Sequence, residues 1–176
     1  MPQSFETVVE VAATPEQVFV RLDDQSRLAA HMERPSAMMG GGRMTYDFDA
    51  GRGQMVGSHI RMGGSAFGLS LAVDEVVTER DPPRRKVWRT AGATRLIILD
   101  AYSMGFDLDA IATGTRLRVW IAYSLPKAGA RRLLGRLMAP GYARWCVGRM
   151  ARDAADFFAM PTPDAGPVAA AWPRRN

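Results

Sequence analysis

The sequence predicts an α+β domain in which a curved antiparallel β-sheet wraps around one long C-terminal α-helix. Between residues 44 and 123, apolar and polar residues alternate with a period of two, in six segments separated by short turns rich in Gly or Pro. From about residue 130 to 160, apolar residues recur instead at helical spacing. A sheet with one apolar face needs a cover, and only this helix is long enough to supply it.

Length and composition indicate one domain with a tail. The chain has 176 residues and a mass of 19.3 kDa, enough to bury a core without disulfides or metal. The single Cys excludes an internally disulfide-bonded scaffold, and 47% hydrophobic residues exclude disorder for most of the chain. We expect one domain over residues 1–160 and a flexible tail rich in Pro and Ala over residues 161–176.

The N-terminal region predicts one strand followed by two short helices. Phe5–Ala12 is rich in β-branched residues, as is typical of a strand. The first helix begins after Thr14, which can accept a bond from a free backbone N–H, while Gln17 completes a capping box and Pro15 suits the first turn. A second short helix is predicted from Ser26 to about Met32.

Six further strands follow from the alternation, at about 44–49, 56–62, 67–79, 86–90, 96–108 and 117–123. In each of them one alternating set is expected to face the helix, and the helix-facing side chains form the predicted interior. The predicted interior consists of Tyr46, Phe48, Ile60, Met62, Leu69, Leu71, Trp88, Tyr102, Met104, Phe106, Val119 and Ile121. Ser58 has the same parity as Ile60 and is expected to add a polar group to this interior.

The long helix carries a continuous apolar stripe. The stripe runs over Ala143, Cys146, Val147, Met150, Ala154 and Phe157. Pro140, followed by Gly141, is expected to kink this helix or to split it from a shorter one before it. Cys146 lies in the middle of the stripe, so we expect a buried and unreactive thiol.

This order of elements, together with three local motifs, resembles the helix-grip superfamily called SRPBCC. The motifs are Glu10–Phe19 followed by Leu22–Asp24, then Pro82–Arg85, and last Tyr142–Cys146 in the long helix. The superfamily includes START lipid-transfer domains, the pollen-allergen family, polyketide cyclases and an accessory protein of carbon monoxide dehydrogenase. The resemblance covers about residues 3–159 and implies a helix-grip fold with a deep apolar cavity between the sheet and the long helix.

Three functions are compatible with this interpretation. The first is binding or transport of a hydrophobic small molecule, such as a lipid, a quinone or a polyketide-like compound, with the predicted interior as its lining and Tyr46, Tyr102 and Ser58 as polar contacts. The second is an enzyme of the cyclase, aromatase or dehydratase type that uses polar groups of the cavity. The third is a protein-interaction module without a ligand. Binding without catalysis is the preferred interpretation.

Catalytic candidates are few. His31 lies near the end of the second short helix, where it can act as an acid or base or interact with the helix C-terminus. Asp100 has the inward parity of its strand, and an inward carboxylate is unusual. His59 is expected on the solvent side of its strand. Two His and one Cys predict neither a metal site nor a cofactor.

The net charge of +5 is concentrated in one segment. Between Lys127 and Arg152 there are seven basic residues and no acidic one, so the rest of the chain is slightly acidic. Leu residues alternate there with Arg, as in helices that lie on an anionic membrane. The residues expected at such a surface are Arg131, Arg132, Arg136, Trp145 and Arg149.

The alternative for this basic segment is a solvated helix whose Leu side chains pack on the edge of the sheet. No nucleic-acid-binding motif occurs, so nucleic acid is not an expected partner. The first residues do not resemble a signal peptide, and no apolar stretch is long enough to span a bilayer. We therefore expect a cytoplasmic protein that can contact an anionic membrane peripherally.

Overall fold

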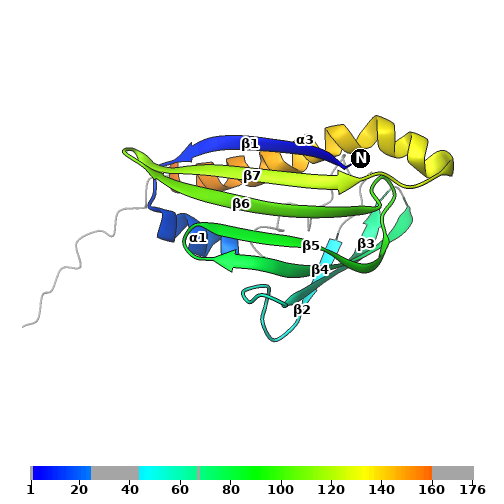
Figure 1. Cartoon of the computed structure of the whole chain (residues 1–176), viewed down its shortest axis with the longest axis horizontal. Coiled ribbons are helices and arrows are strands. Elements are labelled where there is room, and N and C mark those ends of the chain that lie inside the picture. The colour runs from blue at the N-terminus through cyan, green and yellow to red at the C-terminus, as the bar shows by residue number, and fades with distance from the viewer. Residues whose placement is uncertain (1, 25–43, 67, 160–176) are drawn as a thin grey trace, which may run out of the picture.

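A computed structural model of the chain shows a seven-stranded antiparallel sheet with a long helix along one face (Figure 1). It describes residues 2–24, 44–66 and 68–159, so the predicted second helix, His31 and the predicted tail lie outside the described residues. The elements are β1 (Gln3–Val11), α1 (Pro15–Asp23), β2 (Met44–Phe48), β3 (His59–Ala66), β4 (Leu69–Asp81), β5 (Arg85–Arg95), β6 (Ala101–Ile111), β7 (Gly114–Ser124) and α3 (Gly129–Ala159).

The sheet is a meander to which the first strand is added at the end. The strand order is β1-β7-β6-β5-β4-β3-β2, so the first and last strands of the chain are neighbours. They pair along their whole length, from Gln3 opposite Tyr123 to Val11 opposite Thr115. The α+β arrangement predicted from the alternation is confirmed.

The helix α1 begins as its capping residues predict. The Thr14 hydroxyl accepts a bond from the Gln17 backbone N–H, and the Gln17 side chain accepts one from the Thr14 N–H in return. The apolar side of α1 is buried, and the Phe19 ring meets the Phe106 ring of β6 edge-on, with 5.6 Å between centroids. This contact seats α1 on one end of the sheet.

A buried cluster of charged residues, Asp23, Arg80 and Lys86, links the end of α1 to the sheet. The fully buried Lys86 places its Nζ 2.9 Å from Asp23 Oδ1, and it donates to the Asp23 carbonyl at 2.8 Å. Arg80 donates to the same carboxylate through Nε and Nη2. Burial alone would raise the pKa of Asp23, but these hydrogen bonds outweigh it and hold the pKa below its usual value.

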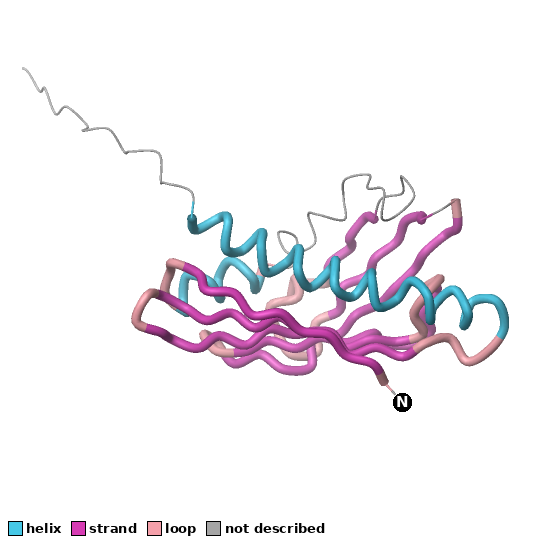
Figure 2. Tube along the Cα trace, turned by 90° about the horizontal axis from the view of Figure 1, so that it is seen from above, coloured by secondary structure: helices cyan, strands magenta, loops and turns pink. Residues whose placement is uncertain are grey.

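The long helix α3 is unbroken over 31 residues, so of the two outcomes expected at Pro140, a kink or a split, the split is wrong. A proline removes one intrahelical hydrogen bond, and packing on both sides of it keeps the helix together. The helix α3 runs along the sheet and contacts β1 and β7 (Figure 2). Its buried positions include small residues, which permit close packing: Ala139, Ala143, Ala151 and Ala154.

The C-terminal end of the predicted apolar stripe needs a correction. Phe157 is 41% exposed, and the Arg21 guanidinium lies 3.9 Å from its ring centroid. The neighbouring Phe158 packs against the core instead. The helix rotates by about 100° per residue, so at its end the buried position has passed from one Phe to the next.

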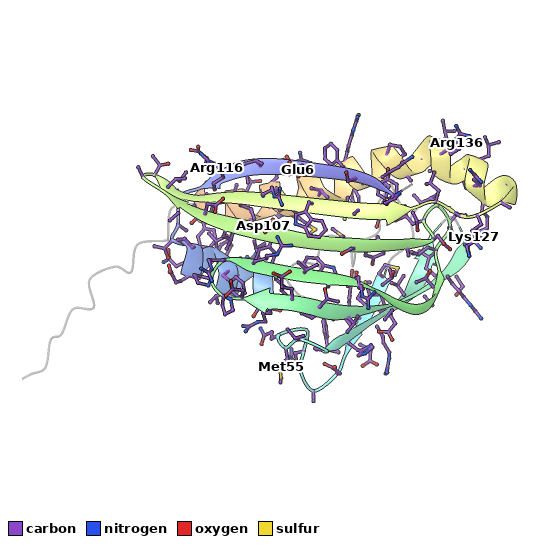
Figure 3. All side chains as sticks on the ribbon, viewed as in Figure 1. Glu6, Met55, Asp107, Arg116, Lys127 and Arg136 are labelled. Atoms are coloured by element: carbon purple, nitrogen blue, oxygen red, sulfur yellow. The ribbon has the colours of Figure 1, made fainter. Side chains whose placement is uncertain are left out.

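The outer face of the sheet carries a polar network centred on Asp107 of β6, labelled in Figure 3. This carboxylate accepts bonds from Arg85 of β5, from Arg118 Nε at 3.1 Å and from Trp120 Nε1 at 3.1 Å. The Trp120 ring covers Gly105, the residue opposite it in the ladder. Gly105 is therefore a position where the absence of a side chain is required.

We predict that Gly105→Ala destabilises the fold by about 1–3 kcal/mol, because overpacking forces neighbours apart. The added Cβ would lie 2.7 Å from both the Trp120 ring and the Lys86 carbonyl oxygen. Urea unfolding followed by circular dichroism measures the loss. Gly63→Ala is the matched control, since its Cβ would meet only Thr45 Oγ1, at 3.9 Å. Equal effects of the two substitutions would contradict this explanation.

We further predict that Lys86→Met lowers the free energy of unfolding by about 3 kcal/mol, because it leaves the Asp23 carboxylate buried without one of its two cations. The double variant Lys86→Met/Asp23→Leu should recover part of the loss, since it removes both buried charges. Chemical denaturation measures both values. A double variant less stable than Lys86→Met alone would show that the charge cluster itself is not the cause.

Candidate functional site

A cluster of polar side chains lies inside the apolar interior between the sheet and α3. At its centre is Glu75 of β4, which is 4% exposed. The Tyr102 hydroxyl of β6 donates to Glu75 Oε1, and the Trp88 side chain of β5 also hydrogen-bonds this carboxyl group. Three neighbouring strands thus direct one polar group each to the same point.

The strand pattern explains why Glu75 points inward. Its neighbours of the same parity, Val73 and Val77, are both buried, so β4 turns this whole set towards α3. Trp88 is paired with Met104 in the adjacent ladder, and both are buried. The carboxyl group therefore lies among apolar and aromatic side chains.

Other titratable groups meet this centre from β2 and α3. The Tyr142 hydroxyl of α3 interacts electrostatically with Tyr46 of β2, with Tyr102 and with Glu75. The Cys146 thiol, one turn further along α3, is also an electrostatic neighbour of Glu75. We call Glu75, Tyr46, Tyr102, Tyr142 and Cys146 the interior polar cluster.

Burial dominates the acid–base properties of the interior polar cluster. It raises the pKa of Glu75 to about 7, although the Tyr102 and Trp88 hydrogen bonds and the charge of Lys86 oppose it. It raises the pKa of the Cys146 thiol to about 12 and those of Tyr102 and Tyr142 well above their usual value. Within the cluster, Glu75 is the group that changes charge near neutral pH, and the thiol stays protonated.

The structure places most of the predicted interior as the alternation indicates. Seven of these side chains are buried: Ile60, Met62, Trp88, Met104, Phe106, Val119 and Ile121. Four others are half-buried and pack against the core: Tyr46, Phe48, Leu71 and Tyr102. Contact of these residues with a ligand stays a prediction.

Three predicted placements are wrong. Leu69 is 54% exposed, because it lies at the hairpin end of β4, opposite Ala66. Ser58 is buried but precedes β3, and its hydroxyl donates to Asp49 and accepts from the Gly53 N–H in the preceding turn. Asp100 precedes β6 and is exposed, so its parity does not point it inward.

Of the two histidines, only His59 lies among the described residues. His31 lies outside the described residues, while His59 is partly exposed and meets Asp74 at 2.9 Å, as expected for a surface position. Among residues 2–24, 44–66 and 68–159, no three His, Cys, Asp or Glu side chains are grouped so that they could hold a metal ion. No helix in this part of the chain is long and apolar enough to cross a membrane.

The predicted membrane surface divides into two parts. Arg131, Arg132 and Arg136 are exposed in the first turns of α3. Trp145 is half-buried and packs against the core beside Tyr142, and Arg149 forms an ion pair with Asp153 at 2.9 Å. Trp145 therefore belongs to the packed part of the helix, whereas Arg149 is exposed but paired with a carboxylate.

Sequence reasoning missed Glu75, the centre of the site. The available signal was the alternation of β4, in which a single carboxylate interrupts the apolar set before Val77. Tyr142 entered the sequence prediction only within a motif, because its direction depends on how α3 sits on the sheet.

Comparison with known proteins agrees with this architecture. A family model described as polyketide cyclase / dehydrase and lipid transport matches residues 2–156. No curated protein sequence matches the chain.

Solved structures share the fold at low sequence identity. Norcoclaurine synthase from Thalictrum flavum has a TM-score of 0.64 and 12% identity, over 92% of this chain and 96% of that one. The Zhui aromatase/cyclase from Streptomyces sp. R1128 has a TM-score of 0.60 and 15% identity, over 88% and 94%. Protein CV1439 from Chromobacterium violaceum has a TM-score of 0.60 and 18% identity, over 90% and 98%.

The family model covers most of the chain, and the structural similarities extend over nearly the whole described domain. These matches also agree with the SRPBCC resemblance carried by the sequence motifs. The chain therefore belongs to the polyketide cyclase / dehydrase and lipid transport family.

Proposed function

We propose that the protein binds a hydrophobic small molecule between the concave face of the sheet and α3, and that Glu75 and Tyr102 hold its polar group. The observation that carries this proposal is the hydrogen-bonded Glu75–Tyr102 pair inside an apolar interior. A carboxyl group is costly to bury, and strongly perturbed carboxyl groups are concentrated at functional sites.

The tyrosines next to Glu75 are enclosed by protein but are not fully covered. Tyr102 and Tyr142 are surrounded by protein closely enough for burial to raise the pKa of each, yet both keep accessible surface. Leu71 and Tyr46 are likewise half-buried and packed against the core.

The chemistry of this lining indicates the class of ligand. Its surfaces are aromatic, aliphatic and thioether groups, which adapt to an apolar guest. A protonated Glu75 can donate to a carbonyl oxygen, and an ionised one can accept from a hydroxyl group. A lipid, a quinone or a polyketide-like compound that carries one such oxygen fits these requirements. The family description, which names polyketide cyclases and lipid transport, supports the same class.

An enzyme of the cyclase or aromatase type is the second candidate. The pKa of Glu75, at about 7, suits a group that both accepts and donates a proton at neutral pH. The approach of Tyr102 and Tyr142 to this carboxyl group favours it, since these hydroxyls could orient a reacting carbonyl. Norcoclaurine synthase and the Zhui aromatase/cyclase are enzymes by name, so catalysis is compatible with the fold.

We predict that purified protein carries or binds an apolar compound that depends on this pair. Native mass spectrometry and organic extraction detect a co-purifying molecule, and titration with 1-anilinonaphthalene-8-sulfonate measures access to the interior. Leu71→Trp should fill the space and abolish the signal. Tyr102→Phe should weaken binding of the extracted compound about five- to tenfold, the value of one hydrogen bond.

Glu79→Gln is the matched control for this experiment, because Glu79 lies on the same strand but pairs with Arg85 outside the interior. Wild-type affinity is expected for it. Absence of any bound compound and of any probe binding would overturn the binding proposal. Conversion of the extracted compound by wild-type protein but not by Glu75→Gln would assign the enzyme instead.

We also predict that Glu75 makes the fold less stable as the pH rises. The folded-state pKa of about 7 lies above the usual value of 4.5, so between these values the folded protein holds a proton that the unfolded chain has lost. Wild-type stability should fall by about 2.5 kcal/mol between pH 5 and pH 8 relative to Glu75→Gln. Urea unfolding at both pH values, with Glu79→Gln as control, measures this difference; parallel pH profiles for wild type and Glu75→Gln would contradict it.

A further inference from the structure

The first turns of α3 present two large apolar side chains to the outside. Leu133 is 73% exposed and Leu137 is 79% exposed, and they lie one helical turn apart. Figure 2 shows this part of α3 extending past the ends of the strands. The alternative is a solvated helix whose Leu side chains pack on the edge of the sheet, and this packing is wrong for Leu133 and Leu137. Gly135, between them, is on the covered side of the helix, where a Cβ would lie 2.6 Å from the Ile98 carbonyl oxygen.

Positive charge gathers at the start of the same helix. Among the described residues, no Asp or Glu forms an ion pair with Lys127, Arg131, Arg132 or Arg136. Arg131 donates to the Leu96 carbonyl and Arg132 Nη1 donates to the Lys127 carbonyl at 2.9 Å. These acceptors are neutral, so they orient the guanidinium groups and leave the charge in place.

A groove runs beside these cations. It has a volume of about 570 Å³ and lies where the start of β1, the end of β7 and the beginning of α3 meet. Its lining consists of Pro2, Gln3, Ser124, Leu125, Pro126, Lys127, Arg132 and Arg136. Figure 3 shows Lys127 and Arg136 at this same end of the molecule. Three cations on its wall make it complementary to a phosphate group.

We infer that this end of the molecule docks on the surface of an anionic lipid bilayer. The docking surface consists of Lys127, Arg131, Arg132, Leu133, Arg136 and Leu137. Its cations would meet lipid phosphates, and its two Leu side chains would enter the boundary between headgroups and acyl chains. The exposed Leu pair favours lipid over nucleic acid or an acidic protein, because those partners offer it no apolar phase.

The structure also limits the extent of this surface. Trp145 and Arg149 do not belong to it, since the first packs against the core and the second is paired with Asp153. Asp100 is exposed at the same end of the sheet, next to Ser124, and reduces the local positive charge by one. The docking surface keeps a net positive charge.

Co-flotation of the full chain with lipid vesicles tests the inference. Vesicles of phosphatidylcholine alone are compared with vesicles that contain about 30% phosphatidylglycerol, at about 0.1 M and at about 1 M salt. Wild type should float with the anionic vesicles at low salt only. The triple variant Arg131→Gln/Arg132→Gln/Arg136→Gln should bind about 100-fold more weakly, from about fivefold for each Arg. Leu133→Ser/Leu137→Ser should also bind more weakly, with the charge unchanged.

The matched control is Arg61→Gln/Arg89→Gln/Arg116→Gln, which removes the same charge from exposed positions on the strands. It should keep wild-type affinity for the vesicles, and so should Glu75→Gln, which separates this inference from the proposed ligand site. Equal losses in the two triple variants, or equal binding to neutral and anionic vesicles, would overturn it. So would binding of the wild type to RNA or polyglutamate but not to vesicles.

Discussion

The close contact of α3 with β1 and β7 is the packing constraint on which the rest of this molecule depends. Ala139, Ala143, Ala151 and Ala154 let the helix approach these two strands without large side chains between them. Larger side chains, such as Trp88, Met104 and Tyr142, belong to the same core. The interior polar cluster lies among these larger side chains.

The polar groups of the protein fall into three environments with different consequences. On the outer face, Asp107 joins β5, β6 and β7 through partly exposed pairs, which contribute little each but fix the strands in register. At the end of α1, Asp23 and Lys86 are buried together and neutralise one another. Glu75 differs from both, because its bonds come from neutral Tyr102 and Trp88 groups, which leave burial free to raise its pKa.

The two ends of α3 lie in different environments. The central and C-terminal turns are packed and contribute Tyr142 and Cys146 to the interior. The N-terminal turns project, and their Leu133 and Leu137 are exposed beside cations that have no carboxylate partner among the described residues. A bilayer bound there would lie at the end of the molecule where β1 begins and β7 ends.

The sequence by itself determined the class of the fold, the order of its elements and which face of most strands is buried. These properties follow from periodicity and capping, and local signals such as Thr14 with Gln17 are sufficient for them. Only the tertiary structure shows which residues meet in the candidate site. Only the register of β4, β5 and β6 shows that Glu75, Trp88 and Tyr102 meet, because residues 27 apart become neighbours through pairing and not through spacing along the chain. The alternation also predicted the wrong direction for Leu69 and Asp100, which lie at or beyond the ends of strands. Hydrogen bonding between strands enforces the alternation, and it stops at these positions.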